Sequence, residues 1–226
     1  RVLFRSNAGC PQVIVDVVGY FEGTTPTAAG GFNGVTPKRL LDTRPDGTGV
    51  VQNTGCIAAS DGAGAGRALK VTGTVNSQDT TVPDSASAVA LNVTVVNPSV
   101  AGYVTVYPTG ATKPNASSVN YTAGQVVPNN VQVAVGTGGQ INLFASGGCP
   151  QVIVDVVGYS TGGTPVGEGG FTGVTPKRLL DTRPDGSGVT QRTGCVAASD
   201  GLGTGRAVKV TGFVNAQDTT VPDNAS

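Results

Sequence analysis

The sequence predicts an all-β protein made of tandem domains, each a β-sandwich or a barrel-like Greek key of about eight strands. Three observations lead to this prediction. Apolar and polar residues alternate with a period of two along many short segments, as they do on the two faces of a strand. Gly, Pro, Asn and Asp interrupt the alternation, and no segment keeps a period of 3.6 residues, so helices are expected to be absent or single turns. Much of the pattern then occurs a second time along the chain.

The expected strands follow from this alternation, one segment at a time. In the segment 91–95, Leu91, Val93 and Val95 share one face, while Asn92 and Thr94 lie on the other. The final segment, 152–158, is apolar on both faces, which is typical of a strand in the interior of a sheet. The complete set of expected strands is 39–43, 68–75, 91–95, 102–107, 117–121, 131–135, 141–145 and 152–158.

A long internal repeat is the main feature of the chain. Residues 10–20 return unchanged as 149–159, an offset of 139 residues. Residues 32–87 return as 171–226 at the same offset, with roughly four residues in five identical. Near-identity over so long a stretch indicates a duplicated domain rather than a chance similarity.

Segments rich in Gly, Thr and Pro, without periodic apolar residues, mark the linkers between domains. They predict one complete domain of a size that can bury a normal core. The expected organisation is the C-terminal strands of a preceding repeat at 1–20, a linker at 21–31, one complete repeat domain at 32–159, a linker at 160–170, and the N-terminal part of a following repeat at 171–226.

Three short motifs carry a resemblance to a known family. The segment 35–44 reads VTPKRLLDTR and returns at 174–183; 90–98 reads ALNVTVVNP; and 154–159 reads VDVVGY. Together they resemble a repeat domain of secreted actinobacterial and related bacterial proteins, whose unit begins at a similar RLLDTR and ends at a similar DVVGYF. Such domains occur singly beside hydrolases or in tandem. The resemblance implies an extracellular, secreted or cell-surface β-domain, and it brings no catalytic residue with it.

The composition argues against several classes of function. The 14 basic and 14 acidic side chains cancel without any run of like charge, so no positive field for nucleic acid is expected. No apolar stretch reaches the roughly 20 residues of a membrane-spanning helix. The chain has no His, the commonest general base, and its glutamates, Glu22 and Glu168, lie in the expected linkers. We therefore expect that this segment is not an enzyme.

The cysteines suggest a disulfide, for which there are two schemes. Cys10 and Cys149 precede the closing strand of a repeat, and Cys56 and Cys195 follow the opening strand. In a secreted protein such cysteines are expected to be oxidised. Cys56 with Cys149 closes one domain on itself, whereas Cys10 with Cys56 and Cys149 with Cys195 joins consecutive domains. The first scheme is preferred, because it constrains a longer loop.

Two further groups of residues are candidates for contacts. Asp155 lies in a strand that reads as buried, so it needs a cationic partner; we expect the first and last strands to meet and Asp155 to pair with Arg44. Tyr103 and Tyr107 project from one face of their strand, opposite Val104 and Val106. They are expected to fill a packing or domain interface, with a sugar-stacking platform as the alternative.

No cofactor is expected, and calcium is the one metal considered. The glycine-rich segment 61–66 lacks the strand before it and the helix after it that a phosphate-binding loop requires. A structural Ca²⁺ ion has oxygen donors available, although the alternating Asp/Asn spacing of a dedicated calcium loop is missing. These donors are Asp42, Asp46, Asp61 and Asp79.

The function expected from the sequence is that of a structural repeat segment in a long extracellular bacterial surface protein: a stalk, fibre, filament or surface coat. A role met by length or multivalency explains many near-identical copies, whereas catalysis requires one good site. The expected partners are neighbouring repeats and identical chains. The alternative is a multivalent carbohydrate-binding or adhesion module that binds cell-wall glycan through Tyr103 and Tyr107.

Overall fold

The computed structural model describes residues 27–47, 55–75, 78–163, 170–183, 207–214, 217–218, 221–223 and 225. Its regular structure is almost entirely β-strand, and every strand pair is antiparallel. The helical content of the described residues is two single 3₁₀ turns, Asp61–Gly64 and Thr137–Gly139. The prediction of an all-β chain is therefore confirmed. None of these helical turns is long or apolar enough to cross a membrane.

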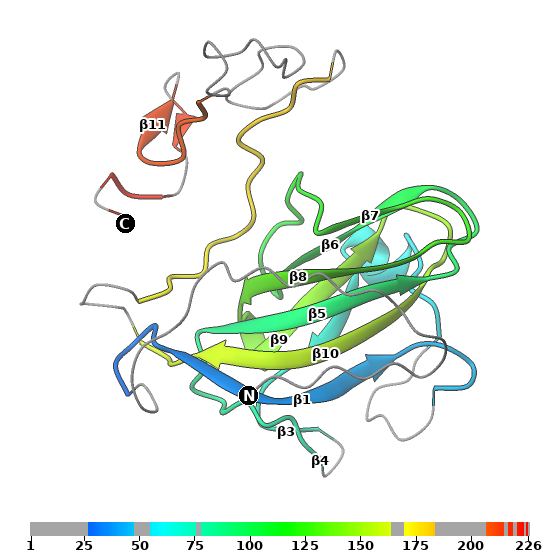
Figure 1. Ribbon diagram of the computed structural model, residues 1–226, viewed down its shortest axis with the longest axis horizontal. Coiled ribbons are helices and arrows are strands. Elements are labelled where there is room, and N and C mark those ends of the chain that lie inside the picture. The colour runs from blue at the N-terminus through cyan, green and yellow to red at the C-terminus, as the bar shows by residue number, and fades with distance from the viewer. Residues whose placement is uncertain are drawn as a thin grey trace, which may run out of the picture.

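Eight of the strands form two four-stranded sheets (Figure 1). The first sheet has the order β1 (Phe32–Asp42), β10 (Gln151–Ser160), β5 (Ala88–Val96) and β8 (Val126–Ala134). The second has the order β2 (Arg67–Lys70), β9 (Gln140–Ala145), β6 (Gly102–Pro108) and β7 (Val119–Tyr121). The other strands of the described residues form two short ladders: β3 (Thr74–Val75) with β4 (Gln78–Asp79), and β11 (Phe213–Val214) with β12 (Gln217–Asp218).

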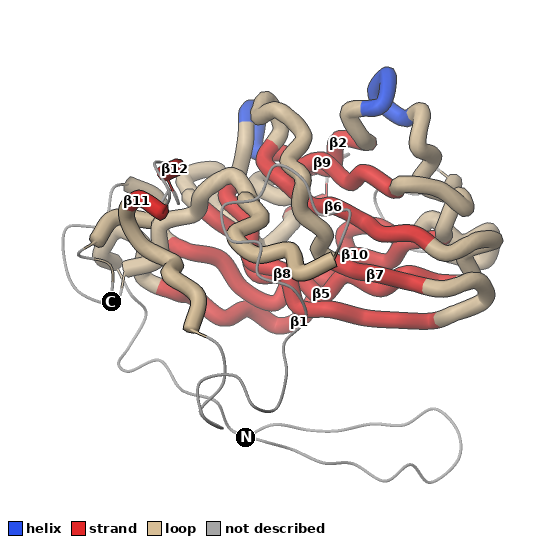
Figure 2. Tube along the Cα trace, turned by 90° about the horizontal axis from the view of Figure 1, so that it is seen from above, coloured by secondary structure: helices blue, strands red, loops and turns tan. Residues whose placement is uncertain are grey.

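The two sheets share one apolar core, and they lie as two layers in Figure 2. Alternate residues of each strand face this core, as the period of two predicts. The first sheet contributes Leu91, Val93, Val95, Val152, Val154 and Val156, and the second contributes Val104, Val106, Ile141 and Leu143, all with essentially no exposed surface. The inward faces expected for 91–95 and 102–107 are thus observed.

One expected strand is divided in two. The alternation over 68–75 suggests a single strand, but β2 ends at Lys70 and β3 begins at Thr74. Gly73 between them has φ = 62°, a conformation that L side chains rarely adopt, and a Cβ there would lie 2.5 Å from the Asp84 carboxylate. The chain therefore turns at Gly73.

The chain enters and leaves the two-sheet body at the same end. Because β1 and β10 are antiparallel neighbours, Phe32 lies opposite Ser160. The Gly30 amide donates to the Thr161 carbonyl at 2.8 Å, and the Thr161 amide donates to the Gly31 carbonyl at 2.9 Å. We call this end, with Gly30, Phe32 and Ser160, the terminal pole; the opposite end, where β1 ends at Asp42 and β10 begins at Gln151, is the distal pole (Figure 1).

Candidate functional site

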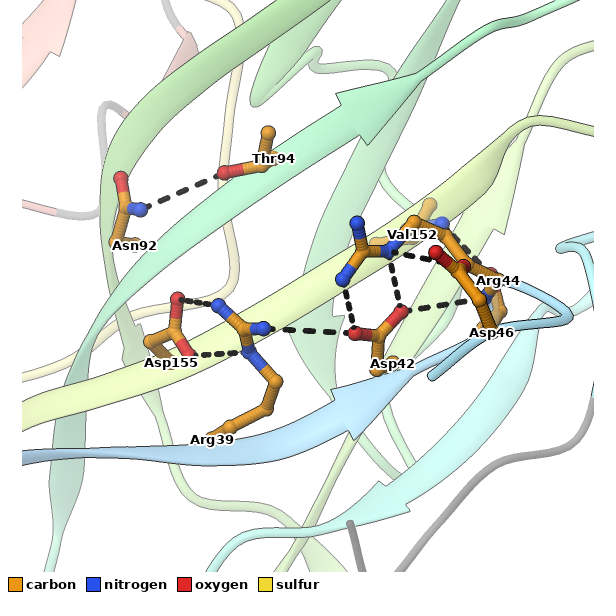
Figure 3. A network of polar contacts seen from close by, with 9 residues as sticks. Arg39, Asp42, Arg44, Asp46, Asn92, Thr94, Val152 and Asp155 are labelled. Atoms are coloured by element: carbon orange, nitrogen blue, oxygen red, sulfur yellow. Dashed lines mark hydrogen bonds and ion pairs between the residues drawn. The ribbon is translucent and has the colours of Figure 1, made fainter. Parts of the chain in front are cut away.

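A cluster of charged side chains lies where the first and last strands of the body meet (Figure 3). Its centre is the carboxylate of Asp42, which is only 2% exposed. Arg44 donates to this carboxylate from Nε at 2.9 Å and from Nη2 at 2.7 Å, and its backbone amide donates at 3.2 Å. Arg39 adds a longer bond from Nη1 at 3.4 Å. The buried charge is thus balanced by two guanidinium groups from the same short motif.

Arg39 connects this cluster to the last strand. Its Nε donates to Oδ1 of Asp155 at 2.9 Å and its Nη2 donates to Oδ2 at 3.4 Å. Arg39 and Asp155 are direct partners in the β1–β10 register. β1 and β10 therefore meet as expected, but the carboxylate of β10 is bound by Arg39.

The expected pairing of Arg44 with Asp155 is wrong. Arg44 follows the end of β1 and is bound to Asp42, two residues earlier, whereas Arg39 lies opposite Asp155. Asp155 is also half-buried rather than buried, because Val154 and Val156 take the inward face of β10. The buried carboxylate of this region is Asp42. Arg39 is the residue that sequence reasoning missed, although it stands in the same RLLDTR motif.

The same cluster forms at the second copy of the motif. Arg183 donates to Asp181 from Nε at 2.8 Å, and Arg178 donates from Nη1 at 3.3 Å. In both copies the hydrogen bond from the second arginine, Arg44 or Arg183, is the main cause of a lowered aspartate pKa, and burial opposes it. Carboxylates held in this way stay ionised near neutral pH, which suits a structural ion pair and not a general acid.

The structure contains the disulfide that closes the body on itself. Cys56 and Cys149 are bonded, with Cα atoms 5.3 Å apart and a sequence separation of 93 residues. The alternative scheme pairs both residues elsewhere and is therefore incompatible with this bond; Cys10 and Cys195 lie outside the described residues. Disulfides of this kind are typical of proteins in oxidising, extracellular compartments.

The loop that carries Cys56 is held by an arginine that the sequence did not single out. Arg67 donates to the carbonyls of Gly55 at 2.6 Å and Cys56 at 2.7 Å. It also forms a 2.7 Å ion pair with Asp61, whose carboxylate accepts the Ala58 amide. The glycine-rich segment 61–66 thus belongs to a loop folded onto β2, and its aspartate has a structural partner.

The expected tyrosine face is not an exposed platform. Tyr107 is 0% exposed, and Asn142 Nδ2 lies 3.4 Å from its hydroxyl while also donating to the Ala65 carbonyl. Tyr103 is half-buried, with its ring 6.3 Å from that of Phe144. Alternation placed both tyrosines on the outward face of β6 but carried no information on what covers that face at Tyr107. A sugar therefore cannot stack on the Tyr103–Tyr107 pair.

The four aspartates considered for calcium do not gather at one site. Asp42 and Asp61 are paired with arginines, Asp46 lies 4.0 Å from Arg44, and Asp79 accepts the Thr81 amide. Within the described part of the chain, no group of three or more His, Cys, Asp or Glu residues is placed to hold a metal ion. The residues therefore do not form a calcium site with one another.

Comparison of the chain with protein-family models, with curated proteins and with solved structures finds no match.

Proposed function

We propose that the chain is a structural repeat segment of a long extracellular bacterial surface protein, a stalk, fibre, filament or surface coat, built from tandem β-sandwich domains. The complete domain is residues 32–159. The observation that carries the proposal is repetition: near-identical sequence, 139 residues apart, is accompanied by the same local structures.

The recurrence is visible in three local structures besides the charged cluster. β3 and β4 pair as Thr74 with Asp79, and β11 and β12 pair at the equivalent Phe213 and Asp218. The Gly73 amide donates to the Val82 carbonyl at 2.7 Å, and its counterpart, the Gly212 amide, donates to Val221 at 2.6 Å. Lys70 is paired with Asp84, as Lys209 is with Asp223. Similar sequences that form these same local structures support a repeating unit.

The geometry of the body supports a self-contained domain. Its first strand pairs with its last, its cysteine pair is internal, and one core cluster joins its two sheets. Each of these features closes the body without help from a neighbouring copy. This is what a domain needs if it is to be strung many times along one chain.

A role without catalysis is part of the proposal. The chain contains no His. Asp42, Asp61 and Asp155, the half-buried or buried carboxylates of the body, are each bound by an arginine. The carbohydrate-binding alternative needs both Tyr103 and Tyr107 exposed, and Tyr107 is buried, so we do not propose it further.

Electron microscopy of arrays with two, four and eight copies of residues 32–170 tests the proposal. The particles should be elongated, and their longest dimension should grow with copy number; the 226-residue chain is the reference. Antibody labelling of intact producing cells should detect the repeat at the surface. Compact particles of unchanging longest dimension, or labelling only after lysis, would count against an extended surface protein.

A further inference from the structure

The start of the following repeat lies against the body at the terminal pole. Phe171 stands 139 residues after Phe32 and is its counterpart. Both residues line one small pocket on the first sheet, together with Ala88, Ala90, Gln132 and Ser160. In Figure 1 the segment 170–183, drawn in yellow, begins beside the C-terminal end of β10.

One backbone hydrogen bond joins the start of the second copy to Gly30, just before the body. The Phe171 amide donates to the Gly30 carbonyl at 3.0 Å, while the Gly30 amide donates to the Thr161 carbonyl. Gly30 therefore contacts both the exit from the body and the start of the next copy. Directional bonds of this kind distinguish a docked segment from a linker that only passes nearby.

The side chains of β5 at this pole are suited to receive a ring. Val89 and Leu91 face the core, so Ala88 and Ala90 face outward; yet they are only 2% and 5% exposed. An outward-facing apolar residue with so little exposure is covered by other groups, and Phe32 and Phe171 line the pocket around these alanines. The small alanine side chains leave room for aromatic rings on a sheet surface.

A pair of equivalent glycines shows that the contact is specific to the second copy. A Cβ on Gly173 would lie 2.7 Å from the Ala134 Cβ and 2.9 Å from its Cα. A Cβ on Gly34, the same position of the first copy, would have the Phe32 ring as its nearest neighbour at 3.9 Å. Only Gly173 is pressed against the edge strand β8.

We propose that the outer face of β5 at the terminal pole is a docking site for the phenylalanine that opens the next repeat. The partner is thus the following copy of the same domain. This inference rests on the proposed tandem array and adds its geometry: consecutive bodies are joined through their terminal poles. The distal poles, with the Cys56–Cys149 disulfide, then face away from the junctions.

Limited chymotrypsin digestion of the 226-residue chain tests the docking. Phe213 is 68% exposed and serves as an internal reference for an accessible phenylalanine. Cleavage after Phe171 should be slower than cleavage after Phe213 by about tenfold or more, because it requires the segment to open first. Equal cleavage rates at the two residues would overturn the proposal.

Matched variants assign that protection to the contacts described. Gly173→Ala should raise cleavage after Phe171 by about tenfold, whereas Gly34→Ala should change it less than about twofold. Ala90→Arg should also raise cleavage after Phe171 by about tenfold. Its control is Thr94→Arg, which lies on the same outward face of β5 but towards the distal pole. The urea midpoint of the body is measured for each variant, so that opening of the junction is separated from unfolding. An unchanged Phe171 cleavage rate in Gly173→Ala and Ala90→Arg would overturn the site.

Failure of the docking and failure of the array give different results. Elongated arrays with a freely cleaved Phe171 would keep the structural function and remove the docking. Compact arrays with a protected Phe171 would keep the docking and remove the extended structural function.

Discussion

Asp42 and Asp155 show how differently two aspartates of one region are used. Asp42 has lost nearly all contact with water and is bound by Arg44 and Arg39, whereas Asp155 keeps part of its surface exposed beside an exposed arginine. Ion pairs at the surface contribute little to stability, while a buried charge without its partner is costly. The stabilising role expected of Asp155 therefore belongs mainly to Asp42.

Asp42→Asn should lower the free energy of unfolding by about 1 to 3 kcal/mol, because it removes a charged acceptor of several buried hydrogen bonds. Asp155→Asn should cost at most about 1 kcal/mol. Asp46→Asn is the control, because Asp46 is 80% exposed and 4.0 Å from Arg44. Urea unfolding of the three variants measures the differences. Equal losses for Asp42→Asn and Asp46→Asn would contradict the assignment.

At the scale of the elements, the ends of β1 and β10 are connected at both poles. Hydrogen bonds connect the chain ends at the terminal pole, and the Cys56–Cys149 bond joins the loop after β1 to the residues before β10 at the distal pole. The Ile57 amide also donates to the Pro150 carbonyl at 3.0 Å next to the disulfide. The first and last strands of the body are thus connected at both ends. The disulfide persists in the unfolded chain and limits its conformations.

Replacing both cysteines, as Cys56→Ser with Cys149→Ser, should lower the free energy of unfolding by about 2 to 4 kcal/mol, because a long loop is no longer closed in the unfolded state. Denaturant titration without reductant measures the change. Cys195→Ser is the control, since it should leave the body's stability unaltered. The scheme that joins consecutive domains would be supported instead by two results together. Cys195→Ser would lower the free energy of unfolding as much as the double variant, and digestion of the unsubstituted chain would yield a peptide that joins Cys149 to Cys195.

At the scale of the whole molecule, stability should stay constant between about pH 5 and 8 and fall in acid. The chain has no His, so no side chain of ordinary pKa titrates between about pH 5 and 8. The pKa of Asp42 is lowered by the hydrogen bond from Arg44, so the folded state binds a proton more weakly than the unfolded state. Its contribution is complete above the ordinary aspartate pKa of about 3.9 and is lost as the pH falls from there through the lower, folded value.

The urea midpoint should therefore be flat between about pH 5 and 8 and fall below about pH 4. In Asp42→Asn the fall should be shallower, because one carboxylate with a lowered pKa is gone. Equilibrium unfolding across this range, for both proteins, provides the comparison. A midpoint that shifts through the neutral range would show that another group controls stability.

The sequence by itself determined the all-β class, the faces of the strands and the 139-residue recurrence. Burial of alternate residues imposes a pattern that local sequence records: Leu91, Val93 and Val95 of β5 lie in the core as the period of two predicts. The charged cluster around Asp42 was not predicted, although the sequence contains the information for it. Its members belong to one motif, and the second copy of the motif adopts the same arrangement.

Tertiary structure alone decided what each outward face contacts. Arg39 binds Asp155 because strand register places them opposite each other. Tyr107 is inaccessible although it faces outward, and Ala88 and Ala90 line a small pocket together with Phe32 and Phe171. The antiparallel pairing of β1 with β10 likewise places both chain ends at one pole. These contacts join residues far apart in the chain, and alternation within a strand records only which side a residue faces, not what covers it.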